Sequence, residues 1–251
     1  MSRISDAFNN KKAFIPFITS GDPDVNTTIK AVKAMAEAGA DIIELGIPFS
    51  DPTAEGPVIQ KANIRALKNG ITTDKVFDMV KEIRKDVKIP LVFMTYANVV
   101  FSYGTERFMK NSAEVGIDGI IIEEKEEFNS VSSRYGIDFI SLIAPTSCGR
   151  IGMIAKEAEG FVYCVSSLGV TGTRSKITTD ISKMVKSVKE AKDIPCAVGF
   201  GISTPEQAAE MAKYADGVIV GSAIVNKCAE YGENCISHIY DYVKSMKSVL
   251  K

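Results

Sequence analysis

The sequence predicts an α/β fold, a closed (β/α)8 or TIM barrel that forms one domain, and three observations support this. Eight apolar runs of strand length recur along the chain, and a segment with helical spacing follows each of them. The runs are nearly continuous in apolar residues, which is typical of a parallel sheet buried on both faces. The chain has 251 residues, 45% of them hydrophobic, a length that such barrels commonly fill as a single domain. These features favour a barrel over an open doubly wound sheet, and no linker-like stretch divides residues 1–251.

The strands are expected in eight segments. They are Ala13–Thr19, Asp41–Gly46, Leu91–Tyr96, Gly119–Ile122, Asp138–Ala144, Phe161–Ser166, Cys196–Phe200 and Gly217–Gly221. Helical periodicity between them is seen, for example, in Ile181, Met184, Val185 and Val188. The first residues, Met1–Phe8, lack the charged and apolar regions of a signal peptide. They are expected to form an extra N-terminal helix.

Composition excludes several classes of function. The chain has 30 basic and 31 acidic residues, so no basic field favours nucleic acid or a membrane surface. The apolar runs are too short to span a membrane. No CxxC pair occurs among the five cysteines, which are expected to be reduced thiols in the cytoplasm. The one histidine, His238, has no partner at metal-ligand spacing, so no metal site is expected.

An acidic loop follows the second expected strand. Glu44 stands at the end of that strand, and Asp51 and Glu55 lie in the following stretch, which also contains three prolines and two glycines. An acid at the carboxyl end of a barrel strand, facing a stiff acidic loop, suits proton transfer to and from a substrate. The alternative is a solvated acidic loop without a chemical role.

Three glycine-rich turns follow the last strands. They are Ser167–Thr173, Gly199–Ser203 and Gly221–Ala223. Glycine lets a backbone approach a ligand closely, and the free N–H groups at helix starts favour an anion. Because loops after strands seven and eight commonly bind phosphate in barrels, a phosphate ester ligand is predicted. No GxxxxGK[ST] or early GxGxxG motif indicates a nucleotide.

With these residues together, the sequence resembles the alpha subunits of tryptophan synthase over nearly its whole length. The resemblance rests on Pro16–Pro23, Glu44–Pro52, Thr95–Asn98, Leu142–Ser147, Gly169–Gly172 and Gly199–Ser203. It implies a lyase of tryptophan biosynthesis that cleaves indole-3-glycerol phosphate to indole and glyceraldehyde 3-phosphate, without metal or cofactor. It also implies an α2β2 heterotetramer with a beta subunit as the partner.

The resemblance also implies roles for individual residues. Glu44 would move protons at the indole C3 and the side-chain hydroxyl, and Glu55 would accept the indole N–H. Four aromatic residues would line the indole and glycerol portion: Phe17, Tyr96, Tyr163 and Phe200. The alternative for each of them, above all for Phe17 and Tyr96, is packing of the barrel. Thr171 would belong to a lid over the substrate. The phosphate would be held by Gly172, Gly201, Gly221 and Ser222. Asp51 suits bracing of the loop better than chemistry.

The sequence departs from the family pattern at two places that matter. Glu55 stands where the family usually has aspartate, and a displacement of ~1 Å can cost ~100-fold in rate. After the fourth strand, Ile120–Phe128 lacks the family's Pro-Asp-Leu-Pro type of loop, which helps to meet the beta subunit, and Glu123 onward resembles a helix start.

Two alternatives to the lyase stay open at this point. One is another phosphate-binding barrel, such as a sugar-phosphate isomerase or epimerase, although these commonly need a metal, a lysine or a second base. The other is a regulator that binds a beta subunit while its own site is impaired.

Overall fold

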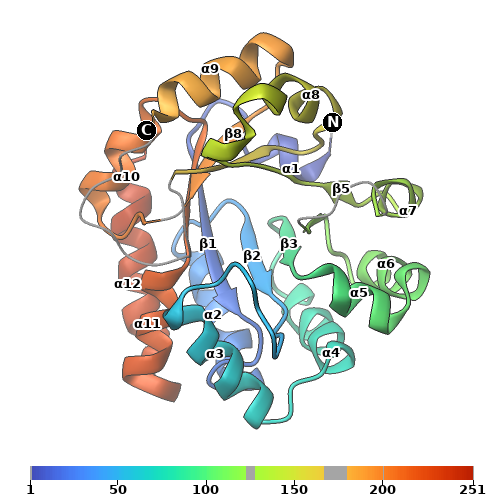
Figure 1. The fold of residues 1–251 in the computed structure, drawn as a ribbon. Coiled ribbons are helices and arrows are strands. Elements are labelled where there is room, and N and C mark those ends of the chain that lie inside the picture. Colours follow the sequence, from blue (N-terminus) through green and yellow to red (C-terminus); the bar gives the residue numbers. More distant parts are fainter. Residues whose placement is uncertain (1, 123–127, 167–179, 200, 251) are drawn as a thin grey trace.

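The computed structural model describes residues 2–122, 128–166, 180–199 and 201–250. In these ranges parallel strands form one barrel-shaped sheet, and helices lie around its outside (Figure 1). The strands are β1 (Ala13–Thr19), β2 (Ile43–Gly46), β3 (Leu91–Met94), β4 (Gly119–Ile121), β5 (Asp138–Phe139), β6 (Ser141–Ile143), β7 (Val162–Val165), β8 (Cys196–Gly199) and β9 (Gly217–Val220). The predicted parallel barrel is confirmed.

The barrel closes within one continuous stretch of chain. β5 pairs with β4, β6 pairs with β7, and only Ile140 separates β5 from β6. The Ile140 N–H donates to the carbonyl of Ile120 at 2.9 Å. The prediction of one strand over Asp138–Ala144 was therefore wrong in one respect: its two halves bond to different neighbours and count as two strands.

Twelve α-helices are found in the described ranges. They are α1 (Arg3–Asp6), α2 (Val25–Glu37), α3 (Pro57–Lys68), α4 (Thr73–Arg84), α5 (Ala97–Tyr103), α6 (Thr105–Glu114), α7 (Asn129–Arg134), α8 (Ile151–Glu157), α9 (Ile181–Ala191), α10 (Pro205–Ala212), α11 (Ser222–Tyr231) and α12 (Cys235–Ser248). Several begin at a residue that caps the helix, as where the Asp24 side chain accepts the Thr27 N–H at 2.9 Å. At the N-terminus the structure has one helical turn, α1.

The strands are buried on both faces, which explains their continuous apolar sequences. Ile15 and Ile219 belong to a cluster inside the barrel, whereas Phe14 and Val218, one position earlier on the same strands, pack outward against the helices. Successive strand residues point to opposite faces. Inside and outside are therefore both apolar, as expected for a parallel barrel.

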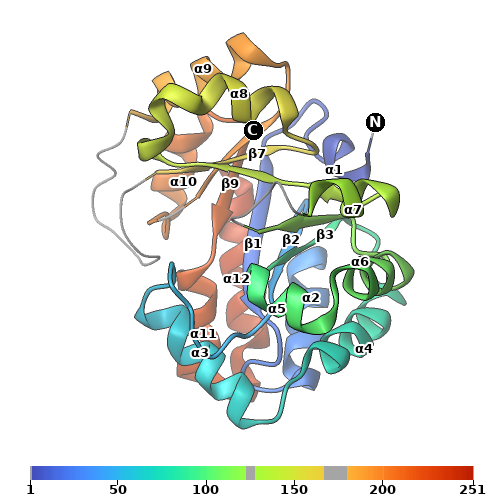
Figure 2. The same cartoon turned by 45° about the vertical axis from the view of Figure 1, so that its right-hand side comes forward.

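The acidic loop lies at the end of the barrel where the strands end. In Figure 1 the arrow of β1 points toward the light-blue connection from β2 to α3, and Figure 2 shows this connection from a second side. That connection is the acidic loop. All five cysteines are free thiols, and no helix in the described ranges is long and apolar enough to cross a membrane.

The opposite end of the barrel is tied to the C-terminal helix by a buried carboxylate. Asp41 accepts the Phe14 N–H at 2.8 Å and forms ion pairs with Lys247 of α12 and with Lys11, both at 2.6 Å. Asp41→Ala is expected to lower the free energy of unfolding by about 2 kcal/mol, because it leaves the buried Phe14 N–H without its acceptor and removes the carboxylate that pairs with the partly buried Lys247 ammonium. Urea unfolding measures this change.

The matched control is Asp78→Ala, which removes an exposed ion pair with Lys81. We expect a change below about 0.5 kcal/mol there. Equal effects of the two substitutions would contradict the role given to Asp41.

Candidate active site

Glu44 is a buried carboxyl group inside the barrel. It lies within β2, opposite Phe17 of β1 and Val92 of β3, two residues before the end of the strand. Its side chain is 1% exposed, and among the described residues neither carboxyl oxygen has a hydrogen-bond partner. Burial raises the pKa of Glu44 to about 8. Burying an unpaired carboxyl group is costly, so its position at the carboxyl end of a barrel strand points to chemistry.

Phe17 lies beside Glu44 and depends on two glycines. A Cβ atom at Gly46 would lie 2.5 Å from the Phe17 Cζ atom, and one at Gly221 would lie 3.3 Å from its Cδ1 atom. The ring therefore occupies the space that side chains on β2 and after β9 would otherwise fill. Gly46 is thus required by packing, and Gly221 contacts the same ring that was predicted to face the substrate.

Tyr163 of β7 is arranged in the same way. A Cβ atom at Gly199 would collide with the Tyr163 hydroxyl oxygen and would lie 2.8 Å from its Cζ atom. Burial and, to a smaller extent, the charge of Glu44 raise the pKa of the Tyr163 phenol. The phenol and the Glu44 carboxyl are therefore within electrostatic reach of each other.

Glu55 is the second acid of the site, and it is half-buried just before α3. Its carboxylate accepts the Asn63 Nδ2–H at 2.6 Å, and Gln60 Nε2 donates to its backbone carbonyl at 2.8 Å. Burial raises the pKa of Glu55 to about 7, against the opposing effect of hydrogen bonds with Asn63 and Tyr96. Both Glu44 and Glu55 thus titrate far above an ordinary glutamate.

Tyr96 joins the acidic loop to the next barrel unit. Its hydroxyl accepts the Ala54 N–H at 3.4 Å, and its ring packs on Phe49 with 5.3 Å between the ring centroids. Asp51 is exposed and accepts a hydrogen bond from Ser50. The contacts of Tyr96 organise the loop around Glu55, whereas Asp51 points its carboxylate to solvent.

Helix α3 is held against the barrel end by a partly buried ion pair. Arg65 donates two parallel hydrogen bonds to Asp22, at 2.7 and 2.8 Å, and Asp22 is 1% exposed. One apolar cluster joins the helix to the barrel end: Phe17, Ile59, Ala62 and Val225, with Val58 and Met94 packed on it. The helix that carries the end of the acidic loop therefore has a fixed position beside Phe17.

The described parts of the predicted phosphate site lie on adjacent strands. Gly201 follows β8 with φ of +84°, a conformation that suits glycine. Gly221 and the buried Ser222 follow β9, and Ser222 opens the ten-residue helix α11. The first N–H groups of such a helix have no partner within it and favour an anion. Thr171, Gly172, Phe200 and the segment Glu123–Glu127 lie outside the described residues.

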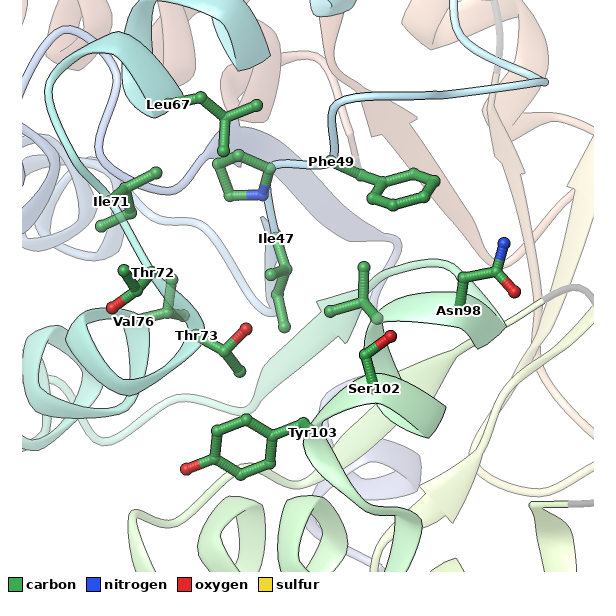
Figure 3. A pocket seen from close by; sticks show the side chains of 12 residues that line it. Ile47, Phe49, Leu67, Ile71, Thr72, Thr73, Val76, Asn98, Ser102 and Tyr103 are labelled. Atoms are coloured by element: carbon green, nitrogen blue, oxygen red, sulfur yellow. The ribbon is translucent and has the colours of Figure 1, made fainter.

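A cavity of about 360 Å³ lies between the start of the acidic loop, the connection from α3 to α4, and α5. Figure 3 shows Ile47 and Phe49 of the loop between Leu67 and Ile71 on one side and α5 on the other. Its lining contains neither Glu44 nor Glu55. In the described ranges no cluster of three metal-ligating side chains occurs, and His238 is exposed and stacks on Tyr231.

Comparison with known proteins decides the family. The family model described as tryptophan synthase alpha chain matches residues 5–251. The chain belongs to the tryptophan synthase alpha chain family. It is 48% identical to the tryptophan synthase alpha chain of Lacticaseibacillus casei, over 98% of this chain and 95% of the relative. The alpha chain of Thermoanaerobacter sp. (strain X514) is 46% identical over 262 positions that cover both chains fully.

A solved structure of Mycobacterium tuberculosis tryptophan synthase matches with a TM-score of 0.89 and 36% identity, over 99% of this chain and 98% of that one. These findings confirm the resemblance and the fold and leave no support for an isomerase or epimerase. Since the Thermoanaerobacter alignment exceeds the 251 residues of this chain, that relative contains residues that this one lacks.

Two contributors to the site were missed from the sequence. Gly46 lies in the Glu44–Pro52 motif, but its contact with Phe17 depends on strand register. Asn63 carries a signal that could have been used: it is a polar residue on the apolar stripe of α3, between Ile59, Ala62 and Ala66. A polar residue in such a stripe needs a partner.

Gly46→Ala tests the packing around Phe17. The new methyl group would displace the ring, so we expect a loss of about 1–3 kcal/mol in the free energy of unfolding together with reduced activity. Gly149→Ala, with no atom within 4 Å of its Cβ, is the control and is expected to change stability by less than about 0.5 kcal/mol. If Gly46→Ala left stability and activity unchanged, the close approach of Phe17 would be refuted.

Proposed function

We propose that this chain is the alpha subunit of tryptophan synthase and cleaves indole-3-glycerol phosphate to indole and glyceraldehyde 3-phosphate. Family membership supports this lyase reaction, and the observation that carries the site assignment is the unpaired, buried carboxyl of Glu44. A carboxyl with a pKa of about 8 is protonated at neutral pH and is ready to act as an acid.

The proposed reaction uses Glu44 twice. Its carboxyl donates a proton to the indole C3 carbon, and the resulting carboxylate accepts the proton of the adjacent side-chain hydroxyl as the carbon–carbon bond breaks. The bond electrons return to the indole ring, the hydroxyl carbon becomes an aldehyde, and Glu44 regains its proton. The step therefore balances without a metal or an organic cofactor.

Glu55 stabilises the charge that develops during this step. Its ionised carboxylate accepts the indole N–H while the ring becomes positively charged. Phe17, Tyr96 and Tyr163 offer apolar faces to the indole and glycerol portion. The backbone N–H groups near Gly201 and Gly221 and the Ser222 hydroxyl bind the phosphate, and we assign Thr171, Gly172 and Phe200 to the same site from family resemblance.

As an alpha subunit, the chain is proposed to assemble with a beta subunit as an α2β2 heterotetramer. A cytoplasmic location is also proposed, because five free thiols suit a reducing compartment. Indole release from indole-3-glycerol phosphate, followed with the purified chain alone and with a beta subunit, tests the function. If no indole is released in either case, the proposed function is refuted. A chain that only regulates a beta subunit would give this same result.

Glu44→Gln separates chemistry from folding. We expect indole release to fall by about 100-fold or more. Stability should rise at pH 7, because the folded state disfavours the ionised form of Glu44 (pKa about 8, against an ordinary value of 4.5), so its contribution to stability falls as the pH rises from about 4.5 to about 8. The gain is at most about 3 kcal/mol. Asp51→Asn is the control and should retain activity.

The dependence of kcat/KM on pH follows from the two carboxyl groups. Glu55 must be ionised and Glu44 protonated, so activity rises as the pH passes the Glu55 pKa of about 7 and falls as it passes the Glu44 pKa of about 8. A narrow bell-shaped profile between these values is expected. A profile flat from pH 6 to 9 (a span about one unit beyond each pKa) would contradict the assignment.

A further inference from the structure

Asn63 is a buried polar residue on a face of α3 that is otherwise apolar. It is 3% exposed, and the other buried residues of that face are Ile59, Ala62 and Ala66. A buried amide without a partner is destabilising by about 1–3 kcal/mol, and asparagine is also a poor helix former. Neither the helix nor its packing therefore explains why asparagine stands here.

The carboxylate of Glu55 supplies the explanation. Asn63 Nδ2 donates to Glu55 Oε2 at 2.6 Å, and hydrogen bonds to a charged acceptor are shorter than neutral ones. We propose that Asn63 is a positioning residue that holds the side chain of Glu55 where it accepts the indole N–H. The inference rests on the proposed function.

Residue 55 is held at both of its ends. Gln60 donates to its backbone carbonyl at 2.8 Å, while Asn63 and Tyr96 bond to its carboxylate. A carboxylate has about four acceptor positions, so two bonds leave capacity for the indole N–H. The long glutamate side chain would otherwise sample several rotamers, and these contacts select one of them.

The donor is fixed in space by the anchoring of its helix. Asn63 lies between Ala62, which packs in the cluster with Phe17, and Arg65, which forms the bidentate pair with Asp22. The amide therefore cannot follow a retreating carboxylate without disturbing that pair. Its position sets how long the side chain at residue 55 must be.

Geometry makes this length specific. Aspartate is shorter by one carbon–carbon bond, about 1.5 Å, so its carboxylate would lie roughly 4 Å from the Asn63 amide, beyond hydrogen-bond range. Glu55→Asp should thus reduce activity in this chain. The Asn63 bond also favours the ionised form of Glu55 and opposes the rise in its pKa that burial causes.

Asn63→Ala is the central test, with Lys61→Ala on the exposed side of α3 as the control. We expect kcat to fall by about 10- to 100-fold, which corresponds to the loss of one hydrogen bond to a charged group, with KM changed by less than about threefold. The acidic limb of the kcat/KM profile should move to higher pH, while the basic limb, set by Glu44, stays in place. A merely structural role for Asn63 would not move one limb alone.

A double-mutant cycle with Glu55→Asp completes the test. Since aspartate does not reach the amide, Asn63→Ala should change the Glu55→Asp enzyme by less than about threefold. The proposal would be overturned if Asn63→Ala lowered the activity of the Glu55→Asp enzyme by the same factor as that of the unsubstituted chain. It would also be overturned if the acidic limb of the pH profile stayed in place in Asn63→Ala.

Failure of the proposed function is recognised separately, because the unsubstituted chain would then release no indole. In that case NMR titration of the ¹³C-labelled Glu55 carboxyl still tests the positioning bond. A higher Glu55 pKa in Asn63→Ala than in the unsubstituted chain supports the bond, and an unchanged pKa overturns it.

Discussion

The candidate site depends on one physical constraint, the burial of the Glu44 carboxyl without a partner. In the ionised state such a group is strongly disfavoured in an apolar interior, so the fold keeps it protonated at neutral pH. That is the state in which it can donate a proton. The barrel tolerates the group because β2 is bonded on both sides, to β1 and to β3, and two apolar layers surround the sheet.

Two strand glycines near Glu44 make room for aromatic rings at this end of the barrel. Gly46 and Gly199 lie on strands, where glycine lowers stability, and each contacts an aromatic ring that lies inside the barrel end. The rings of Phe17 and Tyr163 occupy the places of the missing side chains, and the Glu44 carboxyl is buried. The high pKa of Glu44 and these glycines are thus two parts of one arrangement, since a wetter site would lower the pKa.

The fold could be predicted from the sequence because strand and helix periodicities are local signals. The place of Glu44 could also be predicted, since strands of a parallel barrel end at the same face. Closure through Asp138–Ile143 could not, because it depends on which neighbours each half of that stretch bonds to. The same holds for the partners of Gly46 and Asn63, which are set by register and by the docking of α3, so no local pattern identifies them.

Glu44 and Glu55 carry the same carboxyl group in different surroundings. Burial raises the pKa of both, but Glu55 also accepts hydrogen bonds from Asn63 and Tyr96, which favour its ionised form, whereas Glu44 has no such donor among the described residues. In the reaction proposed above, the group without donors holds its proton longer and would serve as the acid, and the group with donors loses its proton first and would serve as the acceptor. The deeper burial of Glu44 and the hydrogen-bond donors beside Glu55 therefore act in the same direction and together set the two acids apart.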